Sequence, residues 1–515
     1  TRWVLCFFFV DTATAEVYPL SLHDALPSSN DDQIAKIDKN GLLIGNKRGD
    51  TDLIVSYDRA VVAVPVIRPT SDLVGDRYPA VDTPTRVDEL VVTRLRKLGV
   101  VPSDRAGDAE FLRRVRLDLT GTLPSAEEVT RFLEDEAPNK REKKVDELLE
   151  TPAYAAWWTT KLCDFTGNNA QNLNIVSPLR NSAPQEWYSW INRRVEENMP
   201  YDELAAGIIT ATSMRDDQTY REYCEEMSSL YRDEGKSYAD LPSMTYYWSR
   251  RDFQNDIEAR AIGFAYSFMG LRIQCAQCHK HPFDQWSKDD FHQFKNFFSR
   301  IVAGRANATP REHRAEYNEL VAELGLKGKR GNELRKMLPS LLKEGKTIPF
   351  PVMSVSKTIQ RTRNPGGDFP KFDTAKFLGG ETLQVEDLED PRTELMAWLR
   401  SPDNPFFAKA FVNRVWASYF NVGIVEPADD LSLGNPPSNK PLLDYLATGF
   451  IESGFDMKWV HRTIANSRTY QSTWRANETN RLDERNFSRA VLRRLPAEVA
   501  YDAIQQRSEE HTSEL

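Results

Sequence analysis

The hydrophobic pattern changes its period once along the chain, near residue 86, and this change constrains the fold more than any other feature. Between residues 33 and 68, short apolar runs are separated by turns such as Asn40-Gly41, a pair that suits positive φ and is typical of a β-hairpin. From Arg86 onward, apolar residues recur at helical spacing, and Gly99 ends the first such run. The pattern predicts a mainly α protein of multi-helix domains with a small N-terminal β-sandwich.

The helical part divides into several predicted segments. Ser125 and Glu128 form a capping box, which places the start of a helix just after Ser125. Residues 346–385 are rich in proline and glycine and indicate a boundary. We expect helices at 86–98, 111–119, 126–132, 143–149, 254–271, 305–345 and across 391–506.

Composition limits the class of protein. The 515 residues are enough for about two to four domains, and the 11 Trp and 25 Phe residues argue against disorder. The net charge of -9 makes non-specific binding to nucleic acid a poor expectation. We expect no membrane span, because the chain lacks an apolar run of about 18 residues. Five cysteines are too few for a disulfide framework, and only Cys275 and Cys278 are closely spaced.

This cysteine pair belongs to the segment Cys275-Ala-Gln-Cys278-His279, a c-type haem attachment motif. Thiols at this spacing can form thioether bonds to the two vinyl groups of one haem, and the adjacent imidazole can reach the iron as an axial ligand. Covalent haem c is therefore the cofactor that we expect. Two alternatives stay open. His279 and His281 could bind a single zinc or another transition metal beside the thiols, or the thiols could have a redox or structural role.

The sixth ligand of a haem iron is usually His or Met. His281 is too close in sequence to reach the opposite face of the haem, so we expect it to make a supporting contact through the segment 281–284. An open iron position is a further alternative. The candidate ligands are His281, His292, His313, His461 and Met269.

Residues 29–70 resemble the second half of a bacterial Ig-like domain of group 2. The resemblance rests on Ala35-Lys-Ile-Asp-Lys-Asn-Gly-Leu and on Gly49-Asp-Thr-Asp-Leu-Ile-Val-Ser-Tyr. Such domains are usually spacers or adhesive modules, and the resemblance implies an inert spacer here. Residues 71–85 contain proline and aspartate and are expected to form a linker.

Both ends of the chain resemble translated sequencing adapters, over residues 11–28 and over the last nine residues. We therefore expect residues 1–28 and 507–515 to be adapter-derived and set them aside. The remaining chain would then be a fragment that is open at both ends, with any signal peptide lying upstream. On this interpretation Cys6, His23 and His511 have no function.

The helical part resembles a pair of bacterial domains of unknown function, the planctomycete cytochrome-associated families DUF1549 and DUF1553. Their motifs occur here in the expected order, at 111–129, 145–154, 275–286, 404–416, 435–438 and 467–471. One departure is the segment 158–165, which lacks a His that the family commonly has. We expect a cytochrome-associated helical domain at 86–303, a charged helical insertion and irregular linker at 304–385, and a second, truncated helical domain at 386–506.

This resemblance implies an exported protein, often encoded with cytochrome c domains, and no settled reaction. We expect a periplasmic or cell-surface protein that binds haem c and transfers electrons with a redox partner protein or a cytochrome c domain. One alternative is a metal-assisted enzyme of polysaccharide breakdown, with carbohydrate as its partner. Another is a non-catalytic cell-surface scaffold.

The second domain carries polar groups that could line a pocket for an anionic or sugar-like ligand. We favour a structural interpretation instead, in which Arg414 and Arg468 pair with Asp429 or Asp430 and hold helices together. The groups in question are Asn413, Arg414, Trp416, Asp429, Asp430, Asn435, Ser438, Arg468 and Tyr470.

Overall fold

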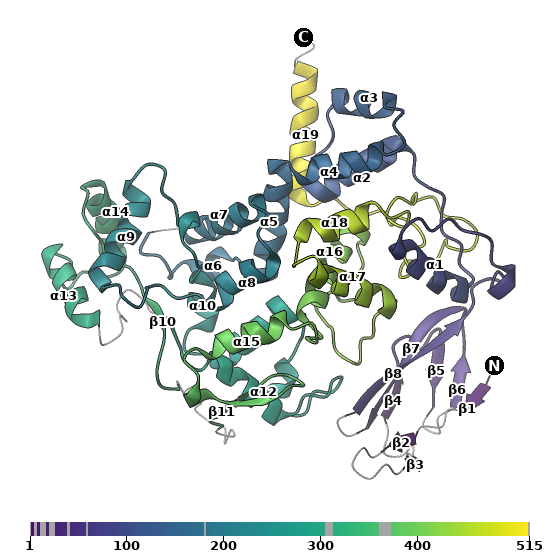
Figure 1. Cartoon of the computed structure of the whole chain (residues 1–515), viewed down its shortest axis with the longest axis horizontal. Helices are drawn as coiled ribbons and strands as arrows, with labels where there is room; N and C mark the ends of the chain where they lie inside the picture. The colour runs from purple at the N-terminus through teal and green to yellow at the C-terminus, as the bar shows by residue number, and fades with distance from the viewer. Residues whose placement is uncertain are drawn as a thin grey trace. The chain divides into compact units, whose positions relative to one another are not determined.

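The computed structural model describes residues 2–4, 8–10, 17–19, 26–38, 42–57, 60–179, 182–303, 313–359 and 372–512. Helices make up most of the regular structure, as predicted (Figure 1). The chain folds into two compact units that interleave along the sequence. Unit 1 contains Thr1–Tyr154, Met269–Ser287 and Pro405–Leu515, and unit 2 contains Ala155–Phe268 and Lys288–Asn404. The domain boundaries expected from the sequence follow the family motifs, and they stay a prediction.

The N-terminal part of unit 1 is built from antiparallel strands. One sheet has the order β4-β7-β8 and another the order β1-β6-β5, and apolar side chains from both, including Ala35 and Leu53, share a small core. β1, β2 and β3 lie within residues 1–28, which were expected to be adapter-derived, and the predicted turn at Asn40-Gly41 lies outside the described residues. The strands are β1 (Arg2–Val4), β2 (Phe8–Val10), β3 (Val17–Pro19), β4 (Leu26–Ser29), β5 (Ala35–Ile37), β6 (Leu42–Gly45), β7 (Gly49–Tyr57) and β8 (Ala60–Arg68).

Two buried acidic residues of β7 fasten these strands to the rest of unit 1. Arg94 Nη2 lies 2.7 Å from Asp50 Oδ2, and Arg485 Nη2 lies 3.2 Å from Asp52 Oδ2. Asn486 Nδ2 donates a further hydrogen bond to Asp50. The β part is therefore held by charge-assisted hydrogen bonds as well as by the linker that follows it.

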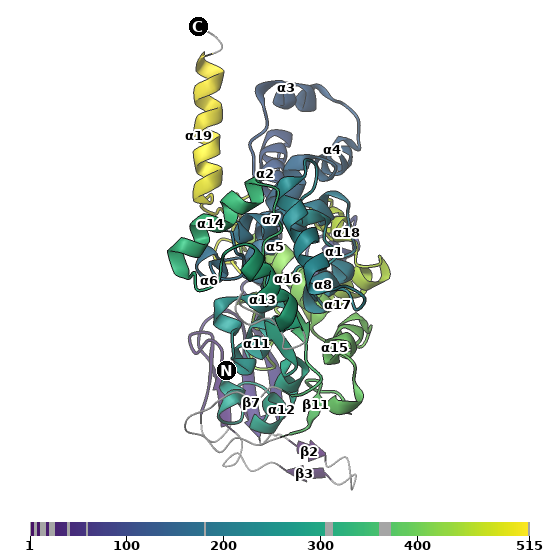
Figure 2. The same ribbon diagram turned by 90° about the vertical axis from the view of Figure 1, so that its left-hand side faces the viewer.

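Local signals explain where the helices of unit 1 begin and end. A capping box between Thr85 and Asp88 starts α1, and Gly99, with φ 67, ends it in the left-handed region. Helices α16, α17 and α18 pack against one another (Figures 1 and 2). The helices are η1 (Gly75–Arg77), α1 (Arg86–Leu98), α2 (Asp108–Thr120), α3 (Ala126–Glu134), α4 (Lys140–Leu149), η5 (Gln274–Gln277), α16 (Phe407–Phe420), α17 (Lys440–Glu452), α18 (Met457–Ala465) and α19 (Ala497–Thr512).

Unit 2 is mainly helical, with two short two-stranded sheets, β10-β9 and β11-β12, and it has a core rich in aromatic rings, among them Trp248 and Phe264. In the described parts of the chain, no helix is long and apolar enough to cross a membrane. The elements of unit 2 are α5 (Pro152–Thr166, which starts in unit 1), α6 (Ala170–Leu173), α7 (Ala183–Glu196), α8 (Tyr201–Ile209), α9 (Tyr220–Arg232), η2 (Tyr238–Asp240), α10 (Tyr246–Ser249), η3 (Arg251–Phe253), α11 (Ile257–Phe264), η4 (Ala265–Met269), α12 (Lys288–Phe294), η6 (Lys295–Phe298), β9 (Ile301–Ala303), α13 (Arg314–Glu323), α14 (Gly331–Lys343), β10 (Met353–Val355), β11 (Thr374–Lys376), β12 (Thr382–Gln384), η8 (Val385–Asp387) and α15 (Pro391–Arg400).

Two stretches contain less helix than the sequence predicted. Within the stretch 254–271, the helical residues form α11 and a π-helical turn, η4. The helix ends at Gly270, because its φ of 60 lies in the left-handed region. Residues 466–496 form turns and irregular structure rather than helix. Their backbone groups bond to residues near α1 and α2, for example Thr473 N to the carbonyl of Asp104. Hydrogen bonds to distant parts of the chain thus replace those that a helix would have made.

Candidate haem-attachment loop and a second candidate cavity

The Cys275–His279 segment forms a single tight turn in unit 1. Cys275 lies in η5 and Cys278 directly follows it, while Ala276 between them is buried and anchors the turn. Side chains at positions i and i+3 of a 3₁₀ turn lie on the same side. Both cysteines are exposed free thiols. The turn therefore offers two thiols on one side, accessible from solvent.

The ring of His279 is also exposed, and one of its nitrogens is engaged. Nδ1 lies 2.6 Å from the carbonyl oxygen of Lys280. Because a carbonyl only accepts hydrogen bonds, Nδ1 carries a proton, and in the neutral tautomer Nε2 is the nitrogen with the free lone pair. An Nδ1–H bonded to a backbone carbonyl is the usual arrangement of a His that ligates a metal through Nε2.

His281 faces the interior instead. Its Nε2 lies 2.9 Å from the carbonyl oxygen of Arg272, and the backbone N–H of Phe283 donates to its Nδ1 at 3.3 Å. Burial lowers the pKa of His281, so the neutral ring links two backbone segments of the loop. The supporting contact at a haem that was expected for residues 281–284 stays a prediction. Within the described residues, no group of three or more His, Cys, Asp or Glu side chains is arranged to hold a metal ion.

The loop is fixed on both sides to the segment 429–434. Arg272 Nη2 lies 2.8 Å from Asp429 Oδ1, and the N–H of Leu431 donates to the carbonyl of Gly270 at 2.8 Å. The N–H of Gly434 donates to the carbonyl of Phe283 at 2.9 Å. These contacts place the motif in a rigid frame although its own turn is exposed.

The carboxyl group of Asp284, three positions after His281 in the sequence, has a shifted pKa. Asp284 is buried, and this burial raises its pKa to about 6, even though the N–H of Gln285 donates to its Oδ1 at 2.8 Å. The neighbouring Asp430 contributes to the same rise. Because this pKa lies only slightly below neutral pH, the buried carboxyl is still mostly ionised there, while the thiols face water.

The candidates for a sixth iron ligand lie in different surroundings. Met269, His281 and His461 are buried in unit 1. His292 is buried in unit 2, and His313, in the same unit, stacks on Tyr220 with ring centroids 6.4 Å apart. The candidates of unit 1 are thus packed into the fold, and the open iron position stays a prediction.

The polar groups of the second domain have structural contacts. Asn413 is buried and makes two hydrogen bonds to the backbone of Val425. Its Nδ2 donates to the Val425 carbonyl, and its Oδ1 accepts from the Val425 N–H. Arg468 Nη2 donates to the carbonyl of Ser103 at 3.4 Å. The hydroxyl of Tyr470 donates to the buried carboxylate of Asp118 at 2.7 Å. These contacts fit the structural interpretation, although the Asp429 partner found here is Arg272.

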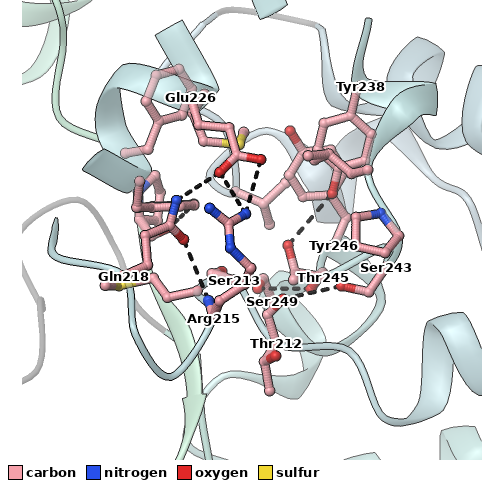
Figure 3. A pocket seen from close by; sticks show the side chains of 18 of the residues that line it. Thr212, Ser213, Arg215, Gln218, Glu226, Tyr238, Ser243, Thr245, Tyr246 and Ser249 are labelled. Carbon is pink, nitrogen blue, oxygen red and sulfur yellow. Dashed lines mark hydrogen bonds and ion pairs between the residues drawn. The ribbon is translucent and has the colours of Figure 1, made fainter. Parts of the chain in front are cut away.

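A second candidate site lies in unit 2, at residues that the sequence analysis did not single out. A cavity of about 360 Å³ is lined by residues of the loop 212–218, by α9 and by the segment 238–249 (Figure 3). Its polar residues are spread over almost forty positions with no fixed spacing, so no motif marks them. The one available signal was the group of tyrosines and hydroxyl residues between 238 and 249.

Comparison with known families gives two matches. Residues 86–303 match the family described as Protein of unknown function (DUF1549), and residues 391–515 match the one described as Protein of unknown function (DUF1553). The chain therefore carries a segment that matches DUF1549 followed by one that matches DUF1553, in the order that the motifs implied. No curated protein and no solved structure matches the chain.

Proposed function

We propose that Cys275 and Cys278 attach a haem covalently, that His279 is its axial ligand, and that the protein transfers electrons outside the cytoplasm. One observation carries the proposal. Two exposed thiols lie one 3₁₀ turn apart, next to an imidazole whose Nδ1 is held by the carbonyl of Lys280. A haem bound there would supply an iron that cycles between two oxidation states.

The residues of this chain would have distinct tasks at such a haem. The thiols of Cys275 and Cys278 would fix its edge, and Nε2 of His279 would bind the iron. His281 bonds to the carbonyl of Arg272, and the Arg272 side chain pairs with Asp429, so the loop is held in place while the thiols stay exposed. Accessible thiols are what an attachment reaction needs, because the thiol groups must meet the vinyl groups directly.

The surrounding domains support a location outside the cytoplasm. Haem c is attached there, and the N-terminal strands resemble an Ig-like module of exported proteins. We propose that this module is a spacer, and that the electron partner is a separate redox protein or a cytochrome c domain. Chemistry on a polysaccharide through a metal at His279 and His281 stays the alternative. The scaffold role, in which the thiols are structural, is the other.

The test is spectroscopic. The full chain, exported in a host with the haem c maturation machinery, should show a Soret band and stain for covalent haem after denaturing electrophoresis. Replacing both motif cysteines, C275S/C278S, should abolish the stain. C163S is the matched control, since Cys163 is a buried thiol in α5 and its replacement should leave the stain intact. A colourless protein with one zinc per chain would contradict the proposal, and a protein with no metal would favour a scaffold.

A further inference from the structure

The cavity in unit 2 has two chemically different walls. Figure 3 shows Arg215, Gln218 and Glu226 on one side, and Tyr238 and Tyr246 on the other. The floor is formed by buried residues, whereas Arg215 stands at the exposed mouth. The cavity volume of about 360 Å³ is at the lower end of the range for small-molecule sites.

The polar wall is pre-organised by its own hydrogen bonds. Arg215 Nη1 lies 3.0 Å from Glu226 Oε2, and Gln218 Nε2 donates to the same oxygen at 2.6 Å. The carboxamide oxygen of Gln218 accepts from the N–H of Arg215 at 3.3 Å. Three planar groups are thus held in one array, and their remaining donors and acceptors are available to adjacent hydroxyl groups of a ligand.

The aromatic wall is equally fixed. Tyr238 and Tyr246 stack with their ring centroids 4.6 Å apart and their planes at 13°. The hydroxyl of Tyr246 donates to Glu186 Oε2 at 2.5 Å, and the hydroxyl of Tyr231 donates to Glu186 Oε1 at 2.7 Å. Burial raises the pKa of Tyr246, so this hydroxyl stays protonated. The rings present a rigid surface for the C–H face of a saturated ring.

The charge of the cavity indicates what kind of ligand fits. Arg215 is the only cation among the described residues that line it, and its charge is matched by Glu226. Asp216 at the mouth adds a further negative charge. An anionic ligand is therefore disfavoured, and the many hydroxyl groups of the lining disfavour a purely apolar one.

We propose that this cavity binds the ring of a neutral carbohydrate, independently of any haem at Cys275. A neutral sugar has vicinal hydroxyl groups that can pair with the array of Arg215, Gln218 and Glu226. It also has an apolar face that can lie against Tyr238. The site requires no contribution from unit 1.

The first experiment uses the full chain on an array of neutral, sulfated and uronic-acid oligosaccharides. The strongest neutral oligosaccharide is then titrated by calorimetry. E226Q should weaken binding by about tenfold or more, because it removes the charged acceptor of the array. Y238F keeps the ring and removes one hydroxyl, whose nearest partner, Thr245, is 3.5 Å away. It should weaken binding by only about threefold.

The matched control is E225Q, one position earlier on α9. Glu225 is exposed and pairs with Arg232, away from the cavity lining. E225Q should bind like the unchanged chain, and circular dichroism checks that every variant is folded. The proposal is overturned if no neutral oligosaccharide binds, if only sulfated or uronic-acid glycans bind, or if folded E226Q and E225Q bind equally well.

Discussion

At the scale of single residues, the backbone groups around a side chain decide what it can do. His279 and His281 are two positions apart, yet one faces solvent and the other is held by two backbone groups. The sequence could identify Cys275, Cys278 and His279 because the motif is local. It could not predict the surroundings of His281, since the carbonyl that holds it belongs to Arg272, nine positions earlier, beyond the turn η5.

His461 is a stronger case of the same effect. Sequence reasoning kept it as a candidate iron ligand, but it is fully enclosed in unit 1. Its Nδ1 lies 2.9 Å from the hydroxyl of Tyr419, and its ring meets Tyr154 edge-on at 5.4 Å. Burial lowers the pKa of His461 to about 3. The side chain is therefore a neutral part of the core.

This pKa predicts how stability depends on pH. An unfolded His titrates near 6.5, so between pH 6.5 and pH 3 the unfolded chain binds a proton that the folded chain does not. The free energy of unfolding should fall as the pH is lowered through this window. Relative to H461Q, the loss should approach about 1.4 kcal/mol per pH unit, measured by urea unfolding at several pH values.

The variant Y419F separates burial from hydrogen bonding. It removes the partner of His461 Nδ1 but leaves the ring enclosed, and burial is the main cause of the low pKa. Y419F should therefore keep the pH dependence of the unchanged chain. Equal slopes for the unchanged chain and H461Q would show that His461 does not titrate in this way.

At the scale of elements, helix ends were predictable where their signals are local, and irregular segments were not. Thr85, Asp88 and Gly99 define both ends of α1 within fifteen residues, and the predicted bounds are confirmed. The segment 466–496 was expected to be helical, but its partners lie hundreds of positions away. Asp88 is one of them. It accepts hydrogen bonds from the backbone N–H groups of Arg468 and Thr469.

Asp88 therefore has two structural roles. It caps α1, and it accepts hydrogen bonds from the backbone of the segment that follows α18. D88N should destabilise the protein by about 3 kcal/mol, because one of its oxygens becomes a donor that faces buried donors. E89Q is the matched control on the same helix turn, since Glu89 is exposed and pairs with the exposed Arg86. It should change the free energy of unfolding by less than about 0.5 kcal/mol. Chemical denaturation measures both, and equal effects would contradict this role of Asp88.

At the scale of the whole molecule, the two family segments share one compact unit. Unit 1 combines parts of the DUF1549 match with most of the DUF1553 match. Their contacts include the hydrogen bond from Tyr470 to Asp118 and the ion pair between Lys458 and Glu150. Neither match outlines a body that is complete by itself. Sequence motifs could reveal the two families and their order, but contact between them depends on long-range pairs that no local pattern encodes.

Residues 86–303 expressed alone should therefore fail to fold cooperatively. Asp88 and Asp118 would lose their partners and remain as buried, unsatisfied groups. Co-expression with residues 391–512 should restore a compact complex, detectable by size-exclusion chromatography and near-UV circular dichroism. The chain 86–512 is the positive control. A cooperative unfolding transition of 86–303 by itself would refute this expectation.

Because the two units interleave along the sequence, the ribosome completes them at different times. Thr469 follows Asp88 by 381 positions, and at ~10 residues per second the ribosome takes roughly 40 s to cover them. Unit 2 is fully synthesised once Asn404 has emerged, whereas unit 1 must wait for Pro405–Leu515. During that interval α1 and α2 stay without their final partners. A transcript cut short before Tyr470 would thus yield a chain whose first helices remain exposed, which proteases and chaperones recognise as unfinished.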